Sequence, residues 1–321
     1  MSTPEALLHC WHPVARSEDV RDKPVAARLL DQPLALWRSG DRISAFYDLC
    51  IHRGTPLSLG WVSDCQLVCA YHGWHYGPDG ACTRIPSLPP ERGIPTKARA
   101  RAFPVQERYG FVWVCLGEPR SDIPALPPEV GDASYRWEAY SQTGQWQANV
   151  ARMVENLADY SHFPWVHPGT LGDREHPESP DVEIEPTPTG FRYHIDQPVN
   201  QLKAGQASRQ TYEVIMPFVL TIDRYQPDGD ERQLNVYLFC PLSSRETRYW
   251  RLCGRNFRPE WPDEELNRRH FLTFEQDRVL VEAQRPEELP VDLAEELHLR
   301  GPDTPSLEYR RRLRDMGISW T

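Results

Sequence analysis

Cys50-Ile51-His52 and Cys69-Ala70-Tyr71-His72 each place one cysteine and one histidine close together, and 16 residues separate the two segments. Cysteine thiolates and histidine imidazoles are common ligands of zinc and iron in proteins. Two arrangements fit four such ligands. Either two cysteines bind one iron and two histidines bind the other iron of a [2Fe-2S] cluster, or all four bind one tetrahedral zinc ion.

The order of the ligands and the residues that flank them separate these alternatives. Zinc sites usually pair cysteine with cysteine and histidine with histidine, whereas each segment here supplies one of each. Arg53-Gly54 follows the first pair and Gly73-Trp74 follows the second, which resembles the loops of a Rieske [2Fe-2S] cluster. Such a cluster accepts an electron more readily than a four-cysteine cluster, because neutral imidazoles replace two thiolates. The predicted cluster ligands are Cys50, His52, Cys69 and His72.

Length, charge and cysteine content narrow the class of protein. A chain of 321 residues is long enough for about two domains. The net charge of −10 argues against a nucleic-acid partner. The sequence contains no long apolar run, and residues 1–5 lack the basic start of a signal peptide, so we expect a soluble cytoplasmic protein without a membrane partner. The cysteines outside the cluster motif are predicted to be reduced thiols, and they are Cys10, Cys65, Cys82, Cys115, Cys240 and Cys253.

The N-terminal part of the chain is predicted to be an all-β domain. Short apolar runs are separated by turns, and Ser39-Gly40-Asp41 joins two of these runs into a hairpin. The stretch Gly77-Pro78-Asp79-Gly80 predicts another turn. The predicted strands are residues 33–38, 43–47, 67–70, 102–105 and 110–116.

A proline-rich, acidic stretch at residues 117–132 ends this domain. Its prolines cannot continue a helix or a central strand. We therefore place a first domain at residues 1–117, a linker at 118–132 and a second domain at 133–321, which is predicted to be α+β with an antiparallel sheet. Its predicted strands are 182–184, 190–195, 212–222, 234–239 and 248–253, and its predicted helices are 148–160, 263–283 and 307–316.

A second group of candidate ligands follows the linker. Asn156, Asp159 and His162 are three residues apart, so in a helix they share one face. Pro164 is predicted to end this helix at the preceding residue, which lets His167 turn back toward the same point. Two histidines beside an acid suit the 2-His-1-carboxylate iron site, which leaves coordination positions open for dioxygen and substrate. The alternative is that these are ordinary polar residues at a helix end.

Over its full length the sequence resembles the catalytic (alpha) component of the Rieske non-haem iron oxygenases, of the vanillate O-demethylase and dicamba monooxygenase type. The resemblance implies an α+β protein in which an all-β Rieske domain precedes a catalytic domain with a helix-grip, START-like fold. The segments that carry it are 50–60 (CIHRGTPLSLG), 69–80 (CAYHGWHYGPDG), 109–117 (YGFVWVCLG), 156–172 (NLADYSHFPWVHPGTLG) and 274–286 (FEQDRVLVEAQRP).

The resemblance also implies roles for individual residues. His162 and His167 match two iron ligands of the family, and Asp277 matches the third. The residues alone do not select Asp277, because Glu275 and Glu282 are acids in the same segment. The family pattern selects it.

Two further residues of the second group have roles that are implied by the resemblance. Asp159 matches the family's acid that links a cluster histidine of one subunit to an iron histidine of the next, here His72 and His162, and this implies a ring of subunits, expected to be a homotrimer. Asn156 matches a residue near the iron, where a structural hydrogen bond is an equal alternative.

The implied activity is that of the oxygenase component of a multicomponent system. It uses dioxygen and electrons relayed from NAD(P)H to hydroxylate or oxidatively demethylate a small aromatic substrate, as a mono- or dioxygenase. The chain carries no Gly-x-Gly-x-x-Gly fingerprint and no plant-type ferredoxin spacing, so we expect a separate flavin-containing reductase, with or without a ferredoxin. The expected cofactors are one Rieske [2Fe-2S] cluster and one mononuclear Fe(II).

The identity of the substrate stays open at this point. Aromatic and apolar residues of the second domain are candidates for a substrate site, although most such residues belong to a protein core. The candidates are Tyr212, Met216, Phe218, Tyr237, Phe239 and Trp250. Two other functions remain as alternatives, a Rieske electron-transfer protein without oxygenase chemistry and a zinc-stabilised binding protein.

Overall fold

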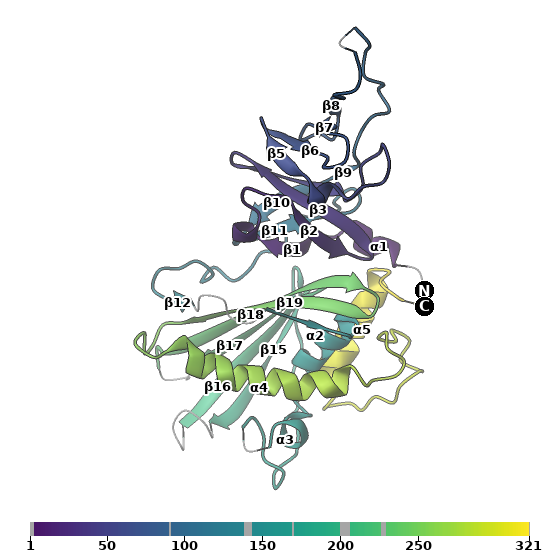
Figure 1. Cartoon of the computed structure of the whole chain (residues 1–321). Helices are drawn as coiled ribbons and strands as arrows, with labels where there is room; N and C mark the ends of the chain where they lie inside the picture. Colours follow the sequence, from purple (N-terminus) through teal and green to yellow (C-terminus); the bar gives the residue numbers. More distant parts are fainter. Residues whose placement is uncertain are drawn as a thin grey trace. The chain divides into compact units, whose positions relative to one another are not determined.

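The computed structural model describes residues 3–89, 91–137, 143–168, 170–199, 206–225 and 229–320. The chain divides into two compact units, of which the first is Leu7–Ile123 and the second is Pro124–Thr321 together with Met1–Ala6 (Figure 1). This division falls inside the segment predicted as a linker, where the described backbone forms neither helix nor strand. The limits 1–117, 118–132 and 133–321 stay predictions.

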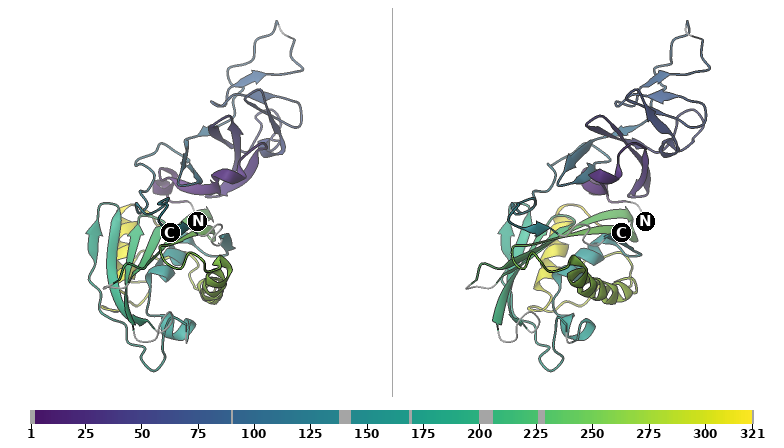
Figure 2. Two further views of the ribbon diagram at one scale, coloured as in Figure 1. Left: turned by 90° about the vertical axis from the view of Figure 1, so that its left-hand side faces the viewer. Right: turned by 60° about the vertical axis from the view of Figure 1, so that its left-hand side comes forward.

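Three small antiparallel sheets form most of the first unit (Figure 2). The first has the order β1-β11-β10, with β1 at His12–Arg16, β10 at Val105–Arg108 and β11 at Phe111–Val114. The second has the order β2-β3-β4-β9, at Val25–Leu29, Gln32–Ser39, Arg42–Tyr47 and Ala102–Phe103. The third has the order β5-β6-β7-β8, at Trp61–Ser63, Gln66–Val68, His75–Tyr76 and Cys82–Arg84. Two 3-10 turns, Ser17–Asp19 and Leu57–Leu59, complete the regular structure of this unit among the described residues, and helix α1 (Glu5–Leu8) contains the boundary between Ala6 and Leu7.

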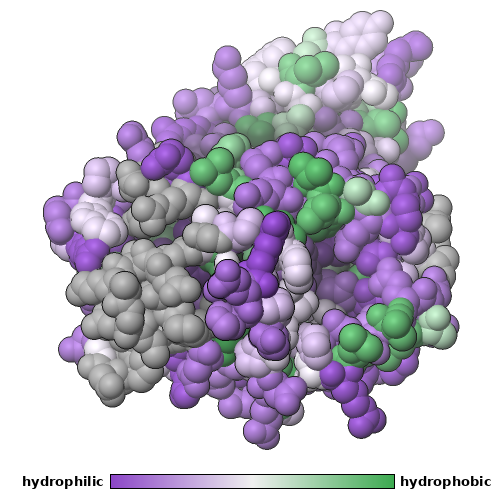
Figure 3. Space-filling model, turned by 90° about the horizontal axis from the view of Figure 1, so that it is seen from below, coloured by the Kyte–Doolittle hydropathy of each residue, from purple (hydrophilic) through white to green (hydrophobic). Residues whose placement is uncertain are grey.

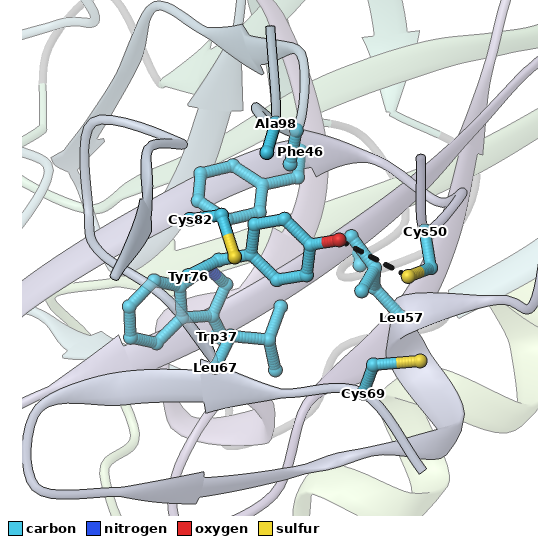
Figure 4. Packing of buried hydrophobic residues seen from close by; sticks show 11 residues of the cluster. Trp37, Phe46, Cys50, Leu57, Leu67, Cys69, Tyr76, Cys82 and Ala98 are labelled. Atoms are coloured by element: carbon cyan, nitrogen blue, oxygen red, sulfur yellow. Dashed lines mark hydrogen bonds between the residues drawn. The ribbon is translucent and has the colours of Figure 1, made fainter. Parts of the chain in front are cut away.

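A tightly buried cluster of side chains lies between the second and third of these sheets. Trp37, Phe46, Leu67 and Tyr76 are fully buried in it, and the rings of Trp37 and Phe46 meet edge to face with centroids 5.6 Å apart (Figure 4). Burying each such side chain stabilises the fold by about 1.5–3 kcal/mol. Cys50 and Cys69 belong to the same cluster, so the hydrophobic core fixes the positions of both cysteines.

The hairpin predicted from the sequence is confirmed in this unit. Strands β3 and β4 pair down to Ser39 and Arg42, and the turn between them places Gly40 at φ +57°, a conformation that glycine adopts readily. The predicted strand 102–105 is interrupted. Pro104 has no N–H to donate, and the chain there passes from β9 of one sheet to β10 of another.

One large antiparallel sheet organises the second unit. Its strand order is β12-β19-β18-β17-β16-β15-β14, and β13 also pairs with β19. The strands are β12 at Arg136–Trp137, β13 at Thr143–Trp146, β14 at Glu185–Thr187, β15 at Gly190–Val199, β16 at Gln206–Ile215, β17 at Val219–Tyr225, β18 at Arg232–Ser243 and β19 at Glu246–Arg255.

Helices cover one face of this sheet (Figures 1 and 2). They are α2 (Val150–Ala158), α4 (Asp263–Val281) and α5 (Thr304–Asp315), and a short helix α3 (Phe163–Val166) follows α2. Asn149 starts α2, because its side-chain oxygen accepts a hydrogen bond from the backbone N–H of Ala151. Glu155 on α2 and Arg310 on α5 form a buried ion pair with two hydrogen bonds, of 2.5 and 2.8 Å. This pair holds α2, and with it the chain that leads into the candidate iron site.

The predicted fold class is confirmed, while several element boundaries are wrong. The predicted strand 212–222 is two strands, β16 and β17, because the chain turns at Pro217, which cannot take part in a central strand ladder. The predicted strand 182–184 is not regular structure, and β14 begins only at Glu185. The surface of the described residues is mostly hydrophilic in the view of Figure 3, with apolar side chains in small separate groups.

Candidate functional site

Cys50 and Cys69 begin two loops with the same backbone pattern. The N–H of Gly54 donates to the carbonyl oxygen of Cys50 at 2.9 Å, and the N–H of Gly73 donates to that of Cys69 at 3.0 Å. Both glycines have positive φ, +72° and +65°, in the region that strongly favours glycine. Each loop can therefore turn tightly and present its cysteine and its histidine toward the same side.

The cysteines and histidines of these loops differ in exposure. Cys50 and Cys69 are 2% and 1% exposed, whereas His52 and His72 are exposed, with ring centroids 4.5 Å apart. The Tyr76 hydroxyl lies 3.0 Å from the Cys50 sulfur (Figure 4). The residues present thus fit a Rieske cluster, with one iron between buried thiolates and the other between two imidazoles that an electron donor can approach.

His162, His167 and Asp277 come together in the second unit, from three different elements. His162 lies in the turn after α2, His167 follows α3, and Asp277 belongs to α4. One possible ligand atom from each residue lies within 4.8 Å of the other two. Among the described residues this is the one group of three or more possible ligands whose atoms all lie this close to one another.

The contacts inside this group are those expected around a metal ion. The Nε2 atoms of His162 and His167 lie 3.4 and 3.0 Å from Oδ1 of Asp277. Nevertheless His162 Nε2 and Asp277 Oδ1 are both buried without a hydrogen-bond partner in the described part of the chain, because their mutual geometry does not make a hydrogen bond. Buried polar atoms without a partner are costly. A cation between them would satisfy both, so the residues fit mononuclear iron.

Each histidine is also held at its other ring nitrogen. His162 Nδ1 lies 3.0 Å from the Asp159 carboxylate, and His167 Nδ1 lies 2.8 Å from Oε1 of Gln276. Both acceptors fix the tautomer in which Nε2 carries the lone pair for a metal. Sequence reasoning did not identify Gln276. Its position next to Asp277 was the available signal, but the pairing with His167 depends on how α4 meets the turn after α3.

The carboxylates set the charge of this site. Burial opposes protonation of His162, but interactions with the carboxylates of Asp159 and Asp277 outweigh it and raise its pKa to about 9. Burial likewise favours the neutral acid at Asp277, yet His162 and His167 lower its pKa. A metal ion must therefore displace a proton from His162, and we expect metal binding to weaken as the pH falls.

The segment before His162 is shorter and more irregular than predicted. Helix α2 ends at Ala158, so Asp159 is its C-cap, and only Asn156 lies within the helix. The prediction that Pro164 ends a helix is wrong. Pro164 lies in the first turn of α3, where a missing N–H costs nothing. Asn156 has a buried Nδ2 atom without a partner among the described residues.

The predicted substrate-site candidates are mostly buried in the sheet. Tyr212, Tyr237 and Phe239 share the sheet face that the helices cover, as the strand register shows. Trp250 pairs with Leu238 and points to the opposite face. Phe218 stacks on Trp320, and Met216 is half-buried in the turn between β16 and β17.

Comparison with known protein families agrees with both sites. Residues 10–104 match the Rieske [2Fe-2S] domain, and residues 146–317 match the vanillate O-demethylase oxygenase C-terminal domain. The chain is a Rieske oxygenase. It is of the alpha-component type. Alpha components of this family join a Rieske domain to an iron-containing catalytic domain and work in a multicomponent system.

Individual relatives share most of the chain. Methylxanthine N1-demethylase NdmA of Pseudomonas putida is 31% identical over 323 residues, which cover 97% of this chain and 90% of the relative. A putative toluene-4-sulfonate monooxygenase system iron-sulfur subunit of Comamonas testosteroni is 31% identical over 310 residues, covering 87% and 88%. The solved structure of P. putida NdmA with caffeine superposes with a TM-score of 0.87 at 31% identity and covers 98% of this chain and 92% of that one. No described helix of the chain is long and apolar enough to cross a membrane.

Proposed function

We propose that His162, His167 and Asp277 bind the catalytic iron of this Rieske oxygenase, and that Cys50, His52, Cys69 and His72 bind its cluster. The observation that carries this proposal is the convergence of Nε2 of His162, Nε2 of His167 and Oδ1 of Asp277, two of which are buried without a hydrogen-bond partner among the described residues. Iron held by these residues would leave positions open for dioxygen and substrate, and a cluster held by the four cysteines and histidines would supply electrons one at a time.

The proposed reaction is hydroxylation or oxidative demethylation of a small aromatic or heterocyclic molecule. Relatives named as methylxanthine, vanillate and dicamba demethylases support it. One oxygen atom inserted into a C–H bond of an O-methyl or N-methyl group gives a hemiacetal or hemiaminal, whose C–O or C–N bond breaks to release formaldehyde, so we favour a monooxygenase over a dioxygenase. We also propose a cytoplasmic location, because none of the eight cysteines, all of which the structure describes, forms a disulfide.

Asp159 is proposed to orient His162 and to connect it to the cluster of a neighbouring subunit through His72. Its Oδ2 faces His162 Nδ1, and its Oδ1 accepts hydrogen bonds from Ser161 at 2.7 and 2.8 Å. A ring of three subunits would give every iron one such neighbour. The electron donor is proposed to be a separate flavin-containing reductase, with or without a ferredoxin.

Turnover by the purified protein tests the proposed function. With electrons from a surrogate flavin reductase, a panel of methoxylated and N-methylated aromatic compounds should give oxygen uptake and formaldehyde for at least one member. Cys50→Ser and His162→Ala should abolish this activity, whereas the matched controls Cys65→Ser and His176→Ala, at exposed positions, should keep it. Activity that survives both Cys50→Ser and His162→Ala would contradict the assignment.

Mixed oligomers test the connection between subunits. Chains that lack the cluster (Cys50→Ser) and chains that lack the iron site (His167→Ala) are each expected to be inactive alone. A mixture assembled together should recover part of the activity, because an intact cluster can then face an intact iron across one interface. If correctly assembled mixtures stay inactive while mixtures of wild type with either variant are active, electron transfer between subunits is wrong.

A further inference from the structure

Arg224 lies on the sheet face that the helices cover. In the strand register, Arg224 of β17 stands opposite Gln210 of β16 and Gln233 of β18. Side chains alternate between the two faces of a strand. Tyr212 lies two residues after Gln210 and Tyr237 lies four residues after Gln233, so both tyrosines share the face of Arg224. A guanidinium therefore lies on the inner side of the catalytic unit.

The same face meets the helix that carries Asp277. The Tyr237 hydroxyl lies 2.9 Å from Nε2 of His270 on α4, and the Tyr237 ring stacks on Phe274 at 5.6 Å between centroids. His270, Phe274 and Asp277 follow each other at helical spacing, so they share one side of α4. His270 and Asp277 are seven positions apart, which is about 10 Å along the helix axis. An aromatic ring with two opposite substituents can span such a distance.

The hydrogen bonding of Arg224 is incomplete. Its Nε atom is buried and has no hydrogen-bond partner in the part of the chain that the structure describes. A buried charged donor without an acceptor is costly, and such groups in native proteins usually have a reason. An anion that accepts this N–H would remove the cost.

The charges around Arg224 favour an anion. Burial raises the pKa of Tyr237, and Arg251 and Arg224 oppose that rise. Burial also places the pKa of His270 well below its usual value, and Arg251, Arg224 and His167 lower it further. Both arginines that act on His270 are cationic, so they contribute a positive potential around the Tyr237–His270 pair.

We propose that Arg224, on the same sheet face as the Tyr237–His270 pair, binds the carboxylate or sulfonate of an aromatic acid while the methyl group of that acid reaches the site of His162, His167 and Asp277. This rests on the proposed oxygenase function and narrows its substrate from small aromatic molecules to aromatic anions. The Tyr237 and Phe274 rings would contact the aromatic ring between these two ends.

Binding without turnover tests this inference. The oxidised holoenzyme, with no reductant present, is titrated calorimetrically with the ortho, meta and para isomers of methoxybenzoate, with their neutral amides and with para-methoxybenzenesulfonate. At least one acid should bind about tenfold or more tightly than its amide. Arg224→Gln should weaken binding of that acid about ten- to hundredfold and change the amide less than about twofold. Comparison of the carboxylate with the sulfonate shows which acid group the site accepts.

Two further variants control the experiment. Arg192→Gln removes an arginine from the opposite face of the same sheet, where it pairs with Glu213, and should change no affinity. Arg224→Lys keeps the charge and should keep the preference for acid over amide. This variant also tests the inference if Arg224→Gln fails to fold. The inference is overturned if no acid binds, if acids and amides bind equally, or if Arg224→Gln affects both alike. A clear acid preference without any turnover would instead contradict the oxygenase proposal alone.

Discussion

Replacement of Asp159 by asparagine keeps the shape of the side chain and removes its charge. In the native site Oδ2 faces His162 Nδ1 at 3.0 Å, while Oδ1 accepts from the Ser161 N–H and hydroxyl. Asparagine has only one oxygen. If that oxygen stays on Ser161, the amide N–H₂ faces His162 and forces the tautomer with a proton on Nε2, where the iron should bind. If the amide is reversed, its N–H₂ faces the Ser161 N–H and that hydrogen bond is lost.

The magnitude is worked from the first arrangement, in which the hydrogen bond between the carboxylate and His162 Nδ1 is lost. The lost hydrogen bond involves a carboxylate and a histidine whose side chain is 15% exposed, so it is worth about 1.5–3 kcal/mol. Partners of metal-bound histidines typically contribute about 10–100-fold to metal affinity. We therefore expect Asp159→Asn to weaken Fe(II) binding about 10–100-fold. At saturating Fe(II) the variant should contain both metals, and its turnover should be lost because the link to the cluster is impaired.

The assay is an anaerobic Fe(II) titration of protein that retains its cluster, followed by turnover at saturating iron. Ser161→Ala is the matched control, since it removes one hydrogen bond to Asp159 but leaves the contact with His162 in place. That variant should change iron affinity less than about threefold. Native affinity and native turnover in Asp159→Asn would refute the role of Asp159 in orienting His162.

Three other outcomes are expected. Gln276→Leu should weaken Fe(II) binding by about tenfold, which is the low end of the range for partners of metal-bound histidines. The reason is that Gln276 is exposed, so water can replace its oxygen on His167. An unchanged affinity in the same titration would contradict this prediction. Glu155→Ala should lower the free energy of unfolding by about 3 kcal/mol in urea, because it leaves Arg310 buried with one carboxylate partner fewer; a loss below about 1 kcal/mol would contradict it. Burial lowers the pKa of His12 to about 4, while the unfolded histidine protonates near 6.5. The free energy of unfolding should therefore fall by up to about 3 kcal/mol as the pH drops from about 6.5 to 4. In urea titrations His12→Gln should flatten this pH dependence.

The sequence was sufficient for the fold class because strong local patterns agree with it. The hairpin of β3 and β4 follows from two apolar runs around a glycine turn, and such a turn needs only local information. Prolines inside apolar stretches were harder to interpret. Pro217 lies between two paired strands and Pro164 lies inside a helix, and neither position is decided by the residue alone.

The residues that the sequence alone identified as metal ligands are those whose side chains rarely occur close together for another reason. Thiols and imidazoles at short spacing predict metal binding, and His162, His167 and Asp277 do converge. Gln276 and Arg224 carry no such signal, because glutamine and arginine are common on surfaces. Their contacts depend on how α4 and β17 meet the rest of the catalytic unit, which is a tertiary property.

Iron stoichiometry combined with the cluster spectrum tests the central claim most directly. The account predicts about three irons per wild-type chain, two in the cluster and one in the catalytic site. His167→Ala should lower this to about two with an unchanged Rieske spectrum, and Cys69→Ser should lose the spectrum while Fe(II) still binds at the catalytic site. A wild-type protein with about two irons per chain, and a His167→Ala variant that matches it, would contradict the account and leave an electron carrier.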